Sequence, residues 1–101
     1  MIAKILIKRK FLKDKTNEIV SILNNLRFIA MEQTGYISGE TLINHKNPSN
    51  KAVLCTWKTM EDWLTWKEKP ERKKLDAMLE VFQVGPTEYE EYLMGTTFEG
   101  Q

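Results

Sequence analysis

Residues 52–66 (AVLCTWKTMEDWLTW) limit the possible fold more than any other stretch of this chain. The first six of them are apolar at both sets of alternating positions, which predicts a strand that is covered on both faces. Near Lys58 the strand gives way to a helix, for which Thr59 is a suitable N-cap, and acidic residues in the first turn suit the helix dipole. All three tryptophans of the chain fall here, at positions 57, 63 and 66. This aromatic surface indicates either the hub of the core or the wall of an apolar pocket.

Period-two and helical patterns divide the rest of the chain into alternating elements. Strands are expected at residues 2–9, 36–44, 52–57 and 87–94. Helices are expected from a cap at Asp14 or Thr16 to about Gln33, and from residue 60, with a restart at Pro70, to the break at residues 84–86. Gly39 marks a bulge or a close approach within its strand. The order β-α-β-β-α-β predicts an α+β, ferredoxin-like domain with a four-stranded antiparallel sheet over residues 1–95, followed by a loose tail at 96–101.

Composition narrows the classes of partner. The 101 residues suffice for one domain, and the formal net charge of +1 provides no field that attracts nucleic acid or anionic lipid. No apolar run is long enough to span a membrane, and no secretory leader is recognisable. Cys55 is the only cysteine, so an internal disulfide is impossible, which suits a reducing compartment. We therefore expect a cytoplasmic protein without nucleic-acid or membrane partners.

Two patterns concern the sheet as a whole. The strands at 2–9 and 52–57 carry aliphatic residues on both faces, while two helices cover only one face, so the second face is too apolar to be left in water. A second copy of the same sheet is the simplest cover, which predicts a homodimer.

Residues 1–15 hold six basic residues and one acid, whereas the last strand is acidic. This asymmetry favours antiparallel pairing of the first and last strands, with Lys4, Lys8 and Lys10 opposite Glu88, Glu90 and Glu91.

Three segments together resemble the antibiotic biosynthesis monooxygenase (ABM) domain family. They are Gly35–Leu42 (GYISGETL), the strand end at Thr56–Lys58 followed by Glu61–Trp66 (EDWLTW), and Gly85–Tyr92 (GPTEYEEY). Their order extends the resemblance over about residues 2–94. It implies a dimer that forms an α/β barrel, with an apolar pocket between sheet and helices. Well-studied members oxidise polycyclic phenols to quinones with molecular oxygen and without metal, flavin or haem, whereas others degrade haem, act on quinols or process small signalling molecules.

The resemblance marks Trp66 as the leading site residue, since in several enzymes of the family the Trp at this position contacts the substrate. The alternative for Trp66 is core packing, which is the role we expect for Trp57 and Trp63. The haem-degrading branch has an Asn on the first strand and a His ten residues after that Trp. In this chain the first strand has Ile and Lys residues instead of the Asn, and Asp76 stands ten residues after Trp66, where that branch has its His. Without an axial His, haem degradation is not expected.

Few residues qualify for acid–base chemistry. His45, the only histidine, is either an exposed turn residue or a base at the pocket mouth, since imidazole titrates near neutrality. Glu40 is a second candidate base, because its strand position allows it to face inward. Hydroxyl and amide groups suited to binding a phenol or quinone oxygen are those of Tyr36, Ser38, Asn44 and Tyr92, and the pattern leaves open which way they face. Cys55, in a buried strand, is interpreted as a small hydrophobe.

The resulting hypothesis is an oxygenase without cofactor or metal. A small aromatic phenol or quinol would lie against Trp66, lose a proton and react as an anion with molecular oxygen. One His and one Cys cannot form a usual zinc or iron site. The alternative is a non-enzymatic protein that binds a small apolar ligand with the same fold. The basic stretch at residues 67–74 is either a solvated helix face or an anion contact.

Overall fold

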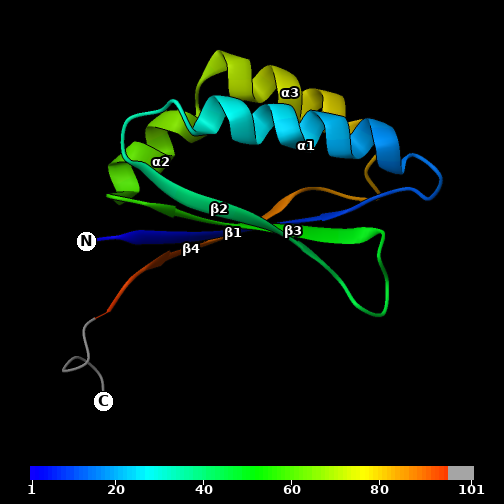
Figure 1. Ribbon diagram of the computed structural model, residues 1–101, viewed down its shortest axis with the longest axis horizontal. Helices are drawn as coiled ribbons and strands as arrows, with labels where there is room; N and C mark the ends of the chain where they lie inside the picture. The colour runs from blue at the N-terminus through cyan, green and yellow to red at the C-terminus, as the bar shows by residue number, and fades with distance from the viewer. Residues whose placement is uncertain (96–101) are drawn as a thin grey trace.

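Four strands form one antiparallel sheet in the order β2-β3-β1-β4 (Figure 1). The computed structural model describes residues 1–95, so the predicted tail at 96–101 lies outside the described residues. The strands are β1 (Ala3–Lys10), β2 (Tyr36–Ile43), β3 (Asn50–Trp57) and β4 (Glu88–Leu93). The α+β, ferredoxin-like arrangement predicted from the order of elements is confirmed.

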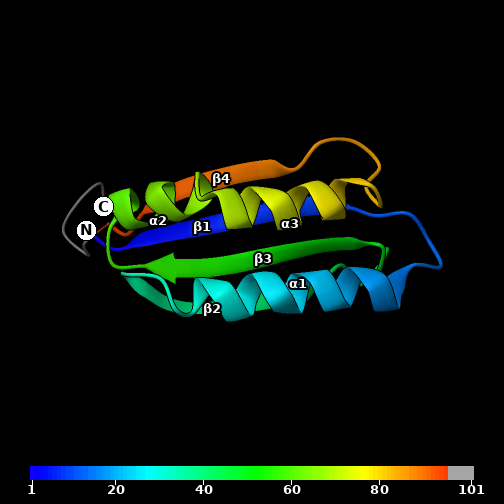
Figure 2. The same cartoon turned by 90° about the horizontal axis from the view of Figure 1, so that it is seen from above.

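Three helices cover one face of this sheet and leave the other face open (Figure 1). They are α1 (Thr16–Ala30), α2 (Met60–Lys67) and α3 (Pro70–Glu80). Seen from above, α1 runs beside α3, and α2 lies at one end (Figure 2). Thr59 caps α2 as predicted, its hydroxyl oxygen accepting a hydrogen bond from the Asp62 backbone N–H at 3.0 Å. The first helix ends at Ala30, three residues before the predicted end, because turns occupy the segment that leads to Gly35.

The core lies between the helices and the inward positions of the two central strands. Ala3, Ile5 and Ile7 of β1 are buried there, and Cys55 and Trp57 of β3 lie opposite Ile5 and Ala3. The inward side chains meet Leu79 of α3 and the buried stripe of α1. That stripe consists of Ile19, Ile22, Leu23, Leu26 and Ala30. Burying a side chain of this size contributes about 1.5–3 kcal/mol. The helix-covered face therefore supplies most of the apolar burial.

A bulge in β2 decides which of its residues face the helices. Tyr36 pairs with Trp57 and Ser38 with Thr56, so Ile37 is an extra residue and the alternation shifts by one. After the bulge, Gly39 lies opposite Cys55 on the helix side, and Glu40 lies opposite Leu54 on the open side. The bulge thus places a glycine, with no side chain, over the interior of the domain.

The open face carries the charge pairing expected between the first and last strands. β1 and β4 are antiparallel neighbours, and the Lys8 ammonium lies 2.6 Å from the Glu90 carboxylate. Lys4 lies opposite Tyr92 instead of an acid, and Glu91 turns to the helix side, so only part of the predicted pairing forms. Among residues 1–95, no helix is long and apolar enough to cross a membrane.

Candidate functional site

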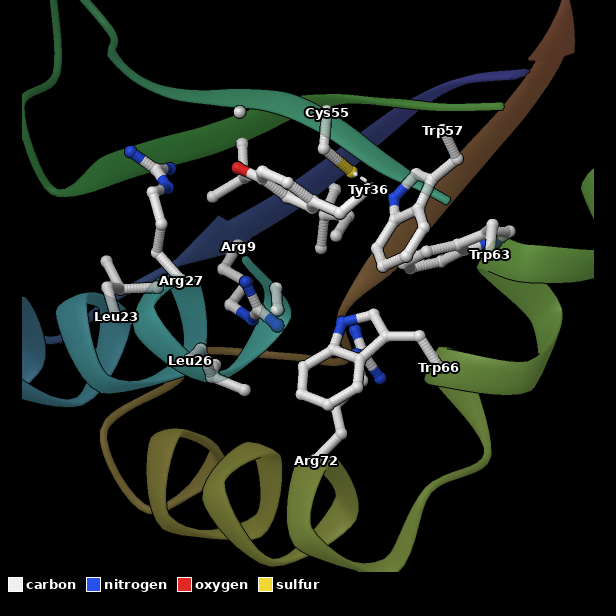
Figure 3. Close-up of a pocket in the computed structure, with 14 residues that line it drawn as sticks. Arg9, Leu23, Leu26, Arg27, Tyr36, Cys55, Trp57, Trp63, Trp66 and Arg72 are labelled. Carbon is white, nitrogen blue, oxygen red and sulfur yellow. Dashed lines mark hydrogen bonds between the residues drawn. The ribbon is translucent and has the colours of Figure 1, made fainter. Parts of the chain in front are cut away.

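A small cavity lies between the sheet and the helices, and Figure 3 shows its walls. About 50 Å³ of it is open to the centre of a water molecule. Every element except β4 contributes to the lining. The lining residues are Ile7, Arg9, Leu23, Leu26, Arg27, Ala30, Tyr36, Gly39, Val53, Cys55, Trp57, Trp63, Trp66 and Arg72.

One wall of the cavity is aromatic. The rings of Tyr36 and Trp57 meet edge to face at 5.3 Å, and those of Trp57 and Trp63 lie 6.1 Å apart. The indole N–H of Trp57 donates to the Cys55 sulfur at 3.4 Å, and that of Trp63 donates to a Glu91 carboxylate oxygen at 2.6 Å. Within residues 1–95, the indole N–H of Trp66 has no such partner, although Trp66 is only 4% exposed. Trp66 is therefore both a packed residue and a free donor at the cavity.

Tyr36 and Arg27 form the polar part of the wall next to β2. A Cβ at Gly39 would lie 2.6 Å from the Tyr36 hydroxyl oxygen and 3.5 Å from the Arg27 Nε, so the missing side chain leaves room for both groups. Arg27 donates to the Thr41 hydroxyl at 2.9 Å. Burial raises the pKa of the Tyr36 phenol, with Arg27 opposing the rise, so the hydroxyl stays protonated near neutrality. Tyr36 is thus a neutral donor beside a cation.

Two further guanidinium groups are almost completely buried at the cavity. Arg9 is 4% exposed and forms an ion pair with Asp76 at 2.8 Å, but its Nε has no hydrogen-bond partner. Arg72 is 3% exposed, donates to the Tyr89 hydroxyl at 3.1 Å and lies over the Trp63 ring at 5.3 Å. In the described part of the chain, no carboxylate pairs with Arg72. A buried charge with this little compensation favours an anionic neighbour.

Cys55 lies within the field of these cations. Burial raises the pKa of its thiol, while the Trp57 hydrogen bond, Arg72 and Arg27 oppose the rise. The net direction is upward, so Cys55 is a neutral thiol rather than a nucleophilic thiolate.

The polar groups of the cavity share one property. The lining side chains include three guanidinium groups, three indoles, one phenol and one thiol, and neither a carboxylate nor an imidazole. Guanidinium and indole groups only donate hydrogen bonds. The arrangement is therefore suited to an aromatic ligand whose oxygen atoms accept hydrogen bonds or carry negative charge.

The structure brings two of the predicted site residues to this cavity, Trp66 and Tyr36. Ser38 and Glu40 do not face inward, because the bulge turns them to the open face. The Asn44 side-chain oxygen accepts hydrogen bonds from the backbone N–H groups of Lys46 and Asn47, at 3.0 and 2.9 Å, in the turn after β2. His45 is exposed in the same turn. Neither residue lies at the aromatic cavity.

Sequence reasoning missed the two buried arginines. Arg9 continues the inward alternation of Ala3, Ile5 and Ile7, which was a signal in the pattern. Arg72 precedes the buried Leu79 by seven residues and therefore shares its helix face. Asp76, at the position where the haem-degrading branch has its His, holds Arg9. Among residues 1–95, no cluster of three His, Cys, Asp or Glu side chains is placed to hold a metal ion.

Comparisons with known proteins identify the fold. No protein-family model matches the sequence, and no curated protein sequence matches it. Solved structures match closely in shape. They include a conserved protein from Methanosarcina mazei Go1 (17% identity, 91% of each chain covered, TM-score 0.85) and a variant of SnoaB, a cofactor-independent oxygenase from Streptomyces nogalater (10% identity, 97% of each chain covered, TM-score 0.83).

A third match is an antibiotic biosynthesis monooxygenase (7% identity, 93% of this chain and 99% of that chain covered, TM-score 0.84). At these identities the likeness establishes the fold alone. The ABM resemblance noted in the sequence is therefore confirmed as a shared fold.

Proposed function

We propose that this protein is a cofactor-independent monooxygenase that oxidises a small phenol or quinol with molecular oxygen in the aromatic cavity. One observation carries the proposal: the cavity combines aromatic walls with polar groups that stabilise an oxygen anion. The fold shared with SnoaB, a cofactor-independent oxygenase, supports it. The open space of about 50 Å³ is smaller than the cavity of about 150 Å³ that holds benzene in another protein. Side chains must therefore shift to admit even one ring, and for that reason we propose one-ring substrates rather than fused rings.

In this proposal the substrate reacts as its phenolate. The Trp66 N–H and the Tyr36 O–H are free to donate to the substrate oxygen, and the nearby guanidinium groups favour its ionised form. No carboxylate or imidazole among residues 1–95 lines the cavity, so the phenolic proton leaves to water. His45 and Glu40 have no part in this step. The protein lowers the free energy of the anion by fixed dipoles and charges.

The electrons come from the substrate itself. An electron-rich ring carbon of the phenolate forms a bond to one oxygen atom of O2 and gives a hydroperoxide. Its O–O bond then breaks, the hydrogen on that carbon leaves as a proton, and water is released. One oxygen atom remains in the quinone and the other is in the water, so a phenol plus O2 gives a quinone plus water. The aromatic walls hold the ring while these steps occur.

Oxygen uptake tests the proposal. Purified protein with one-ring phenols and quinols should consume oxygen above the rate of substrate autoxidation. Trp66→Phe keeps the aromatic ring but removes the free N–H, so we expect kcat to fall by roughly tenfold or more, as for other donors to a reacting oxygen. Absence of uptake above autoxidation across both substrate classes would sink the oxygenase proposal.

One observation favours a second candidate function, a non-enzymatic binding protein for the same ligands. The only histidine is exposed, and no carboxylate of residues 1–95 lines the cavity, so this part of the chain places no conventional general base there. Quenching of Trp fluorescence by a phenol that drives no oxygen uptake would support this function over the first.

We propose in addition that the open face of the sheet is covered by a second copy of the chain. Leu6 pairs with Leu54, and Ala52 pairs with Lys8, at positions that alternate with those facing the helices. Leu6, Ala52 and Leu54 are only partly buried, and no helix covers this face of the sheet (Figure 1). Light scattering at micromolar concentration should give twice the chain mass of 11.9 kDa. Leu54→Lys places a charge on the face and should give the single-chain mass. A monomeric wild-type protein contradicts the dimer.

A further inference from the structure

We propose that the ligand of the cavity is a one-ring aromatic carboxylate, with its carboxylate bound by Arg72 and supported by Arg9. The inference rests on the proposed function in that it names the substrate class of the same cavity. It adds to the phenolic oxygen that the oxygenase proposal requires a second group, a carboxylate, which is ionised at neutral pH.

Arg72 places a buried positive charge at the cavity. Arg72 is 3% exposed, lines the cavity and has no carboxylate partner within residues 1–95. The Tyr89 hydroxyl accepts a hydrogen bond from one of the five N–H groups of Arg72, and the Arg72 Cζ lies 5.3 and 5.6 Å from the centroids of the Trp63 and Tyr89 rings. The group is therefore fixed in position with donors left over. A planar guanidinium of this kind matches the two oxygens of a carboxylate.

Arg9 provides an independent observation. Its guanidinium is held by Asp76 at 2.8 Å, yet its Nε is buried without a hydrogen-bond partner. An unsatisfied buried donor costs free energy, and a ligand oxygen that reaches the Arg9 Nε after a shift of the neighbouring side chains would remove that cost. Asp76 neutralises Arg9 but does not line the cavity, so the positive charge of Arg72 stays uncompensated.

The remaining lining restricts the rest of the ligand. The open space is about 50 Å³, and its walls are mainly the rings of Trp57, Trp63 and Trp66 with aliphatic side chains of α1. Tyr36 and Arg27 lie at the β2 side of the cavity, whereas Arg72 enters from α3 (Figure 3). A one-ring acid with a phenolic oxygen at its far end presents acceptors to both sides. A neutral or cationic aromatic leaves Arg72 unpaired.

The test compares two ligands that differ in one charge, 4-hydroxybenzoate and 4-hydroxybenzamide. Binding is measured by titration calorimetry and Trp fluorescence in a buffer without carboxylates. We expect the acid to bind the wild-type protein at least tenfold more tightly than the amide. Arg72→Met keeps an apolar side chain of similar length, and it should weaken the acid tenfold or more while changing the amide less than twofold.

Lys67→Met is the matched control. Lys67 also lies over the Trp63 and Tyr89 rings, at 5.9 and 4.2 Å, but it does not line the cavity, so its removal should keep the preference for the acid. Arg72→Lys should retain a smaller preference for the acid over the amide, because it keeps the positive charge but loses the paired N–H donors of the guanidinium. This variant replaces Arg72→Met in the test if Arg72→Met does not fold. Equal binding of acid and amide, or a preference that survives Arg72→Met, overturns the inference.

Oxygen uptake separates this inference from the proposed function. Binding of the acid that depends on Arg72, without oxygen uptake, supports the carboxylate site and counts against the oxygenase. Oxygen uptake with neutral phenols, without any preference for the acid, supports the oxygenase and overturns the carboxylate site.

Discussion

Lys8 and Arg9 are consecutive residues of β1, and each is ion-paired, yet they belong to two different environments. Lys8 lies on the open face, 2.6 Å from Glu90, with 44% of its side chain exposed. Arg9 lies on the helix-covered face, 2.8 Å from Asp76, with 3% of its side chain exposed. The two pairs have similar lengths and opposite surroundings, because successive side chains of a strand point to opposite faces.

The difference shows that distance alone does not give the weight of an ion pair. Around Lys8 and Glu90, water and salt screen the attraction and solvate either charge if its partner is removed. Around Arg9, the surrounding side chains are mainly apolar, so the guanidinium depends on Asp76 for its compensation. The covered face therefore holds cations whose environment is incomplete, which is the property that the proposed site uses.

Removal of Asp76 should have the largest effect. Asp76→Ala leaves the Arg9 guanidinium buried without its carboxylate, and we expect the free energy of unfolding to fall by about 3–5 kcal/mol. Urea unfolding at pH 7, followed by Trp fluorescence, measures the change.

Two further variants complete that experiment. Glu90→Ala removes the acid of the open-face pair and should leave the urea midpoint almost unchanged. The double variant Arg9→Met, Asp76→Leu replaces the buried pair by apolar groups and should recover most of the lost stability. If the urea midpoint of Asp76→Ala is close to that of Glu90→Ala, the buried and the exposed ion pair contribute equally to stability.

The same contrast explains what the sequence could reveal. Alternation at Ala3, Ile5 and Ile7 predicted β1 and its inward face, and the chain order of elements predicted the fold, since both depend on local periods. Arg9 occupies the next inward position, but a charged residue there has the same pattern as the exposed end of a strand. Only the contact with Asp76 of α3, 67 residues away, makes it an interior residue.

The prediction of which β2 residues face inward was wrong for a different physical reason. Counting by two from Tyr36 puts Ser38 and Glu40 on its side of the sheet, which made Glu40 a candidate base. The bulge at Ile37 adds one residue and moves both to the opposite face. Gly39 was the only local sign, and the sequence left open whether it marked a bulge or a close approach. The structure shows both, since a bulge precedes Gly39 and the Tyr36 hydroxyl lies against it.

Adjacent positions of β2 test the two faces with a smaller effect. Gly39→Ala puts a Cβ 2.6 Å from the Tyr36 hydroxyl oxygen, so the ring must shift. Overpacking of this kind costs about 1–3 kcal/mol, and the lower backbone entropy of Ala returns about 0.5–1 kcal/mol. We expect a net loss of roughly 0.5–2 kcal/mol in urea unfolding.

Glu40→Ala, one residue further on the open face, should change stability by no more than about 0.5 kcal/mol. Tyr36→Phe removes the obstructing oxygen, so Gly39→Ala should cost less in that background. If the cost is the same with and without the hydroxyl, the close approach is not what requires glycine.

Replacing Glu90 or Glu91 of β4 should have the smallest effect on stability. The dependence of that effect on pH and salt distinguishes the two residues. The Trp63 N–H bond, with Lys67, holds the pKa of the Glu91 carboxyl below its ordinary value against the effect of burial, and Lys8 and Tyr92 lower that of Glu90. A lowered folded-state pKa means that each carboxylate stabilises the fold above its unfolded-state pKa of about 4.3. This contribution is lost as the pH falls through the lower folded-state value.

Glu91→Gln should thus reduce stability at pH 7 and lose its effect progressively below about pH 4. Glu90→Gln should follow the same direction, but its effect should vanish at about 0.5 M NaCl, where exposed charges are screened. The Glu91 effect should persist there, although its side chain is 32% exposed against 35% for Glu90, because its hydrogen bond to the buried, uncharged Trp63 indole is not a pair of charges that salt screens. Equal loss of both effects in salt would place Glu91 in the same environment as Glu90 and remove the contrast between the faces at this end of the sheet.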